Sequence, residues 1–245
     1  MRILGKLFIS LVASSALAST AMAFPSLQLG PGDTTNPDWS YVNETWVYDG
    51  GSTFDLLAFA NATKADGGKG DYAWDTTGTT MTAYLVASVI PDLGNVGGIN
   101  MTISNDGGAL SLVGSGYGTP PELDPNSLAP HGVYPTYYEI YAFQFDGGLT
   151  SIYDTQTGGG NGAGFAELFT ITIGSLPTDA LGVHFDLFTT VGTGLRWNDI
   201  VKSFAPFSHD AEYQVPEPAT LSLLGFGLLL VGFLGRRSRR RTLVT

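Results

Sequence analysis

Residues 137–145 read YYEIYAFQF, and two later runs follow the same pattern: FAELFTITI at residues 165–173 and VHFDLFTTV at residues 183–191. In the first run one set of alternate positions combines aromatic residues with Glu139, the other set is mixed too, and the two later runs behave similarly. We interpret all three as having a period of two, whereas an amphipathic helix repeats every 3.6 residues. Aromatic and β-branched side chains dominate, and both favour strands. The three runs therefore predict strands, and we find no amphipathic helix longer than three turns around them.

Further runs of this composition indicate more strands. They are Ser26–Leu29, Tyr41–Tyr48, Thr53–Ala60, Thr80–Ile90, Ile99–Ser104 and Leu110–Val113, and the run at residues 183–191 begins at Gly182. Four Asp-Gly-Gly triplets, which begin at Asp49, Asp66, Asp106 and Asp146, suit hairpin loops because Asp and Gly tolerate a left-handed backbone. Strands without intervening helices predict an all-β domain over residues 24–213, an antiparallel β-sandwich or jelly roll.

Composition excludes several kinds of chemistry. The chain has no cysteine, so disulfides, Cys-ligated zinc, iron–sulfur clusters and thiol catalysis are absent. Between Phe24 and Pro216 there are four Lys and Arg against 21 Asp and Glu, a net charge of −17. Such a surface repels nucleic acid and anionic membranes, so no nucleic-acid partner is expected. One interpretation is that the negative charge serves solubility alone. The alternative is that the acidic surface also attracts divalent cations.

The first 23 residues resemble a secretory signal peptide. Arg2 and Lys6 form a short basic region, and an apolar run follows over Leu7–Ala18. Ala21 and Ala23 are small residues at the two positions that signal peptidase reads, which predicts cleavage before Phe24. The alternative is a permanent anchor, but the apolar run is short for one.

The C-terminal segment, residues 214–241, has three parts. A motif comes first, a predicted transmembrane helix over residues 219–235 comes second, and a basic tail comes last. The motif is Val215, Pro216, Glu217 and Pro218, and the tail contains Arg236, Arg237, Arg239, Arg240 and Arg241. The two prolines keep the motif extended, the apolar run halts export, and the arginines stay on the cytoplasmic side.

The length of the apolar run indicates a temporary anchor. The fourteen residues of Leu221–Leu234 reach about 21 Å as a helix, against about 30 Å of hydrocarbon. With the complete motif Pro216-Glu217-Pro218, the segment resembles the PEP-CTERM sorting signal, the substrate tag of exosortases. This resemblance implies a Gram-negative exporter with an exopolysaccharide-producing envelope, in which exosortase removes the tail near the motif. The alternative is an ordinary single-pass anchor.

The central domain resembles the choice-of-anchor N family, whose members share an extracellular domain and differ in their C-terminal anchors. The resemblance rests on Pro25–Leu29, Pro130–Tyr138 and Ala205–Ala211. It implies no biochemical activity that could be assigned to any residue.

Catalytic motifs are missing from the sequence. The histidines are His131, His184 and His209, and no Gly-x-Ser-x-Gly elbow accompanies them. His184 shares a strand face with Asp186, which we interpret as a strand-surface pair. We expect His209-Asp210 to have a structural or capping role. No pair of carboxylates is singled out for glycoside hydrolysis. We therefore predict no catalytic residue and no enzyme; a secreted hydrolase ranks third among the candidate functions.

Ligand sites are left open by the sequence. Asp66–Asp71 and Ser104–Gly107 are the loops closest to calcium ligation, but plain turns explain them better. We therefore expect no cofactor, with calcium as the one alternative. The tryptophans, Trp39, Trp46, Trp74 and Trp197, offer either sugar-stacking surfaces or core residues.

The sequence thus predicts an exported structural or interaction protein of the cell surface or the extracellular matrix, associated with exopolysaccharide and biofilm. It would be held transiently at the inner membrane by its C-terminal helix, with signal peptidase and exosortase as processing partners. The alternative is a carbohydrate-binding or adhesin module, whose binding either depends on calcium or does not.

Overall fold

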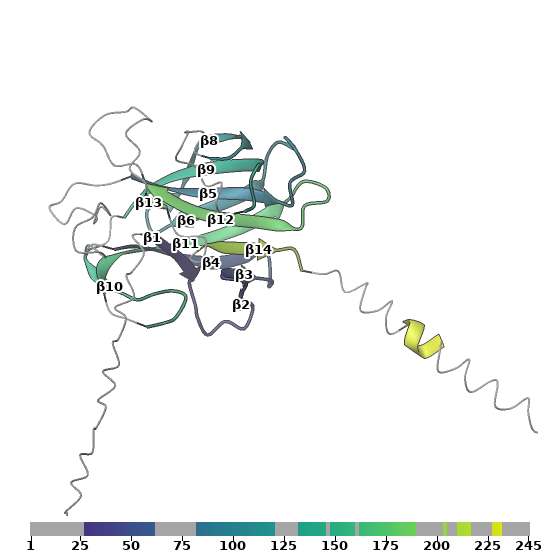
Figure 1. Ribbon diagram of the computed structural model, residues 1–245, viewed down its shortest axis with the longest axis horizontal. Coiled ribbons are helices and arrows are strands. Elements are labelled where there is room, and N and C mark those ends of the chain that lie inside the picture. Colours follow the sequence, from purple (N-terminus) through teal and green to yellow (C-terminus); the bar gives the residue numbers. More distant parts are fainter. Residues whose placement is uncertain are drawn as a thin grey trace, which may run out of the picture.

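The structure is a computed structural model, and it describes residues 27–61, 82–120, 132–145, 148–159, 162–189, 203–204, 210–216 and 227–231. Strands dominate these residues and form two sheets (Figure 1). Both sheets contribute to one apolar core. The predicted all-β fold is therefore confirmed. The jelly-roll form of that prediction stays a prediction.

The first sheet is antiparallel throughout. Its order is β1 (Leu27–Pro31), β4 (Thr53–Asn61), β11 (Gly162–Ser175), β6 (Asn100–Asn105) and β7 (Gly108–Ala109), and β10 (Thr150–Ile152) also pairs with β11. The long strand β11 joins the two halves, because it pairs with β4 on one side and with β6 on the other.

The second sheet is mixed, which corrects the expectation of purely antiparallel pairing. Its order is β2 (Trp39–Val42), β3 (Thr45–Tyr48), β14 (Ala211–Gln214), β12 (Gly182–Thr189), β5 (Thr82–Ile90), β9 (Thr136–Gln144) and β8 (Ser111–Gly118), and β13 (Ser203–Phe204) also pairs with β12. The pair of β14 with β3 is parallel. These two strands lie far apart in the sequence, so no hairpin turn forces them to run in opposite directions.

The core lies between the sheets and collects alternate residues from both. Phe169 and Ile171 of β11 are fully buried, as are Phe185 and Leu187 of β12. Burial of such side chains is the main favourable term in folding. The opposite face of the second sheet carries a smaller cluster, formed by Val86, Tyr138, Ile140 and Phe188.

Two predicted elements differ in the structure. The strand expected over Tyr41–Tyr48 is a hairpin, because Asn43 (φ 50°) and Glu44 (φ 70°) form a tight turn between β2 and β3. Two successive residues with positive φ are the signature of a turn whose twist matches paired strands. The Asp49 triplet connects β3 to β4, which lie in different sheets, so it is not a hairpin; the Asp106 triplet is one, between β6 and β7.

The C-terminal segment is described only in part. Residues 227–231 are helical, while most of the predicted transmembrane helix at residues 219–235 lies outside the described residues. Among the described residues no helix is long and apolar enough to cross a membrane.

Candidate functional site

Strand β12 carries polar side chains on one face and core side chains on the other. Val183, Phe185 and Leu187 belong to the core between the sheets, so His184 and Asp186 face the opposite side. His184 lies across from Ser88 of β5 and from Glu212 of β14. The sequence predicted the shared face correctly, but it was wrong to place the pair on the surface. His184 is 2% exposed and Asp186 is 0% exposed.

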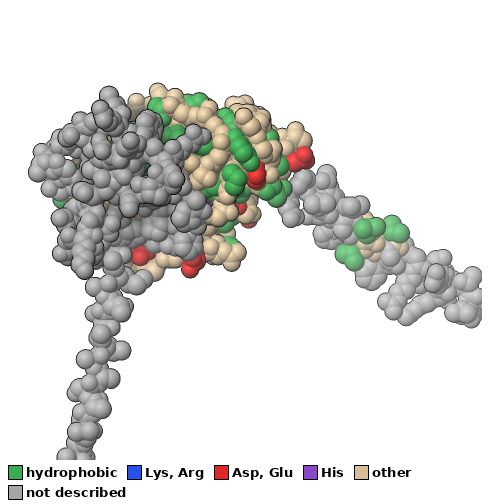
Figure 2. Space-filling model, turned by 45° about the horizontal axis from the view of Figure 1, so that its top comes forward, with side chains coloured by type: hydrophobic (Ala, Val, Ile, Leu, Met, Phe, Trp, Pro, Cys, Tyr) green, Lys and Arg blue, Asp and Glu red, His purple; other side chains and the backbone are tan. Residues whose placement is uncertain are grey.

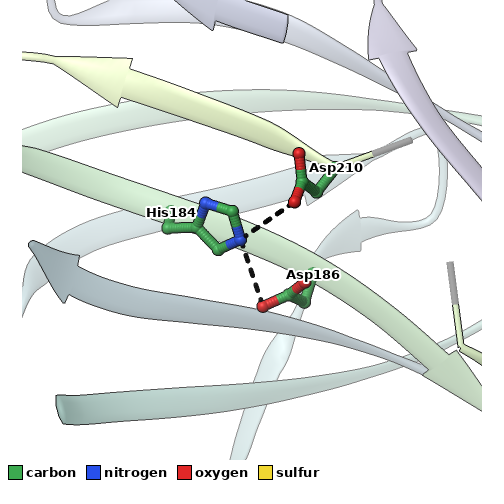
Figure 3. A group of neighbouring side chains, drawn as sticks. All are labelled: His184, Asp186 and Asp210. Carbon is green, nitrogen blue, oxygen red and sulfur yellow. Dashed lines mark ion pairs between the residues drawn. The ribbon is translucent and has the colours of Figure 1, made fainter. Parts of the chain in front are cut away.

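Asp210 completes a group of three. It directly precedes β14, whose pairing with β12 runs from Gln214 opposite Gly182 to Ala211 opposite Phe185. One further step along this register brings Asp210 beside Asp186, on the same face as His184. The Nε2 atom of His184 lies 3.4 Å from the Oδ2 atom of Asp186 and 3.4 Å from the Oδ2 atom of Asp210 (Figure 3).

The imidazole lies between the two carboxylates without a hydrogen bond of ordinary geometry. Figure 3 shows the same ring nitrogen facing both acids. Charge-assisted N–H···O bonds are about 2.7–2.9 Å long, so 3.4 Å is too long for one. Among the described residues neither Nε2 nor Nδ1 of His184 has a hydrogen-bond partner, although both atoms are buried.

The electrostatics of the group favour a positive charge. Burial alone lowers the pKa of His184, but the negative charge and the close side-chain contact of Asp186, followed by the charges of Asp210 and Glu212, outweigh it and raise the pKa from 6.5 to about 9. In the absence of another cation the ring is therefore an imidazolium at neutral pH.

A tyrosine supports one of the acids. The hydroxyl of Tyr134 donates a hydrogen bond of 2.6 Å to Oδ2 of Asp186, and it also lies 3.0 Å from Oγ of Ser88. Burial, together with the negative charge of Asp186, raises the pKa of Tyr134, which keeps its hydroxyl protonated as a donor. Ser88 is fully buried and engaged with Tyr134, so it is not an exposed nucleophile beside His184.

Chemically, the three groups resemble a ligand set. One ligand atom from each of His184, Asp186 and Asp210 lies within 4.8 Å of the other two. Imidazole and carboxylate are the common protein ligands of divalent metal ions. The sequence could not reveal Asp210 as a member, because the pairing that places it beside β12 is between segments far apart in the chain.

The other candidates are scattered. Outside the described residues lie His131, His209, Trp74, Trp197, the Asp66–Asp71 loop, Glu217, Pro218, the five arginines, and the cleavage positions Ala21, Ala23 and Phe24. In the Ser104–Gly107 turn, the side chain of Asn105 is already engaged. Its oxygen accepts a bond from Gly107 N, and its amide donates to Glu167 Oε1 at 2.6 Å.

The two described tryptophans are integrated into the fold. Trp39 is 8% exposed and packs against Tyr48 and Phe54, so it is a core residue rather than a loop residue. Trp46 is half-buried, and its ring N–H donates to the carbonyl of Thr155 at 3.1 Å. The ring face of Trp39 is therefore unavailable for stacking on a sugar.

The sorting segment begins where the last strand ends. The backbone N–H of Val215 donates to the carbonyl of Leu181 at 2.8 Å, directly after β14. Val215 and Pro216 are exposed. The first residue of the motif is thus attached to the edge of the folded domain.

Comparison with known proteins identifies this segment. Residues 214–241 match the family model described as the PEP-CTERM protein-sorting motif. The motif implies an exported protein that is processed by an exosortase. No curated protein matches the chain. A solved structure of AvmM, which catalyses macrocyclization in alchivemycin A biosynthesis, is 9% identical and covers 74% of this chain and 96% of its own, with a TM-score of 0.33. A likeness of that size carries no argument about activity.

Proposed function

We propose, from the PEP-CTERM motif at residues 214–241, that the mature chain is a structural or interaction protein of the cell surface or the extracellular matrix, and that it is not an enzyme. The observation that carries the proposal is the position of the motif. It follows β14 without a linker, so processing beyond Val215 releases a domain whose last strand is intact.

The surface of the domain supports an extracellular role without nucleic acid. The described residues include no Lys or Arg, and Figure 2 shows acidic and apolar side chains on the coloured part of this face. An acidic surface repels nucleic acid and anionic membranes. It is compatible with a hydrated, polysaccharide-rich matrix on a Gram-negative cell. In this proposal signal peptidase removes residues 1–23, and the domain belongs to the choice-of-anchor N family that it resembles.

Fractionation with a matched deletion tests this function. In a host with an active exosortase, the mature domain should be found in the surface and matrix fractions, and deletion of the gene should weaken cell-to-matrix cohesion. If the wild-type protein is exported normally but the deletion strain has an unchanged matrix, the matrix role is contradicted. Processing at the sorting motif would not be affected by that result.

A second candidate, a carbohydrate-binding or adhesin module, has one observation in its favour. A hollow of about 230 Å³ is lined by Asp33, Asn36, Trp39, Thr53, Phe54 and Asp55. The carboxylates of Asp33 and Asp55 and the amide of Asn36 would orient a small polar ligand through hydrogen bonds, since the ring face of Trp39 is packed against Tyr48 and Phe54. Binding on a glycan array that is lost in Asn36→Ala, while the protein stays folded, would favour this candidate over a purely structural role.

A further inference from the structure

We propose that His184, Asp186 and Asp210 form a binding site for one divalent transition-metal ion of the zinc type. The proposal concerns the domain alone and does not depend on its role at the cell surface. Nothing in the sorting motif accounts for a buried histidine between two buried carboxylates.

The first argument is the spacing of the ligand atoms. Zinc binds nitrogen and carboxylate oxygen at about 2.0–2.2 Å in tetrahedral geometry, which separates neighbouring ligand atoms by about 3.4 Å. Nε2 of His184 lies 3.4 Å from Oδ2 of Asp186 and 3.4 Å from Oδ2 of Asp210. That separation is too long for a charge-assisted hydrogen bond, but it is the separation that an ion between the atoms requires.

The second argument is the state of the histidine. Its side chain is almost fully buried, and Nε2 points between the two acids without a hydrogen-bond partner among the described residues (Figure 3). A buried polar atom without a hydrogen bond costs about 1–3 kcal/mol, so native structures rarely keep one. Coordination to a metal ion would satisfy the lone pair of Nε2 directly.

The third argument is charge. Two carboxylates and a neutral imidazole balance a divalent ion completely, whereas an imidazolium balances only one of the carboxylates. Asp186 of β12 lies beside Asp210, which directly precedes β14, and like charges placed opposite each other repel. A divalent ion between them turns this repulsion into attraction to a common centre.

The donor set selects the class of ion. Calcium takes six to eight oxygen ligands, and imidazole is a poor ligand for it. One imidazole and two carboxylates suit zinc and its first-row neighbours. With three protein ligands, a tetrahedral ion keeps one further position for water.

Neighbouring groups hold the ligands in place. All three ligands lie on or beside paired strands, and Tyr134 donates to the ligating oxygen of Asp186 at 2.6 Å. Such outer contacts orient the ligands of metal sites. The ion would also link β12 to the start of β14 and so fix the last strand of the domain.

The test uses the full chain, exported with its own N-terminal segment, purified without chelator and analysed for bound metals by mass spectrometry. The protein is then stripped with EDTA and titrated with Zn²⁺ and separately with Co²⁺. We expect one Zn²⁺ per chain, a higher melting temperature with Zn²⁺, and visible Co²⁺ absorption of the intensity that tetrahedral sites give.

The variants His184→Gln and Asp210→Asn should lose the bound ion and the Zn²⁺-dependent melting shift. Asp106→Asn is the matched control, because it removes one carboxylate from an exposed hairpin turn. This variant should keep the bound ion and the Zn²⁺-dependent melting shift. If a variant fails to fold, the wild-type titration still decides. Folded wild-type protein that takes up no Zn²⁺, or variants that bind Zn²⁺ as the wild type does, would overturn the proposal.

Discussion

The hydroxyl of Tyr141 donates a hydrogen bond of 2.6 Å to Oε2 of Glu139, a carboxylate buried on the core side of β9. The other oxygen, Oε1, accepts the backbone N–H of Ile99 at 2.9 Å and the hydroxyl of Tyr137 at 3.2 Å. Burial, followed by the bond to Glu139, raises the pKa of Tyr141, so its phenol remains a donor. Glu139 therefore connects β9 to the loop before β6.

Replacing Glu139 should destabilise the domain strongly. Glu139→Ala leaves three buried donors without an acceptor, and we expect a loss of about 3 kcal/mol or more in the free energy of unfolding, measured with urea. Tyr141→Phe removes only one of the three bonds and should cost about 1 kcal/mol. Equal losses in the two variants would show that the carboxylate is not the centre of this network.

The charge of His184 should make the metal-free protein sensitive to alkaline pH. Its pKa in the folded protein is about 9, above the ordinary 6.5, because Asp186, Asp210 and Glu212 surround it. The stabilising contribution is therefore complete below about pH 6.5 and is lost as the pH rises through about 9. Urea unfolding in EDTA across this range should show the decline, and His184→Gln should reduce it.

Zinc should reverse this dependence. Coordination needs a neutral imidazole, so metal binding releases a proton and becomes easier as the pH rises. With saturating Zn²⁺ the alkaline decline in stability should disappear in the wild type and, to the same extent, in the Asp106→Asn control, which keeps the three ligands. A decline that Zn²⁺ does not affect would indicate a simple buried ion cluster.

Processing at the PEP-CTERM motif should produce a mature protein that lacks Leu221 to Thr245. Glu217→Ala or Pro216→Ala should leave export intact and should accumulate uncut protein in the inner membrane, which intact-mass spectrometry would detect. Neutral residues in place of the five arginines should instead weaken retention, because positive charge sets the stop. Intact Arg236–Thr245 on mature surface protein would contradict processing and indicate a permanent anchor.

The end of β14 should mark the shortest chain that folds. A chain that ends after Pro216 should melt like the processed protein, because it keeps β14 and the bond from Val215 to Leu181. A chain that ends at Asp210 loses the buried residues Ala211 and Tyr213 and leaves β3 and β12 unpaired on one side. We expect it not to fold, as judged by far-UV circular dichroism. A folded product would show that β14 is dispensable.

Local patterns in the sequence predicted most of the strands, because alternation and turn chemistry act over a few residues. β4, β5, β9 and β12 lie close to their predicted bounds. The short strand β14 was missed because its four residues carry little pattern of their own. The hairpin at Asn43-Glu44 was missed because the turn lacks the glycine that usually marks such a position.

The candidate site was predictable only in part, for a related reason. The spacing of His184 and Asp186 reveals a shared face, but not whether that face is buried. The third member, Asp210, joins them through pairing between β12 and β14. Contacts of this kind depend on the register of strands far apart in the chain, and one residue of slip would turn Asp210 away.

The central position of β14 in the second sheet determines when that sheet can be completed during export. The last strand of the domain lies between β3 and β12, so the second sheet is divided into two parts until residues 211–214 arrive. A chain that crosses a membrane N-terminus first delivers these residues last, immediately ahead of the sorting motif. The second sheet therefore cannot be completed before the residues directly ahead of the processing signal are present, and a chain that ends before them has neither a continuous second sheet nor a tag for release.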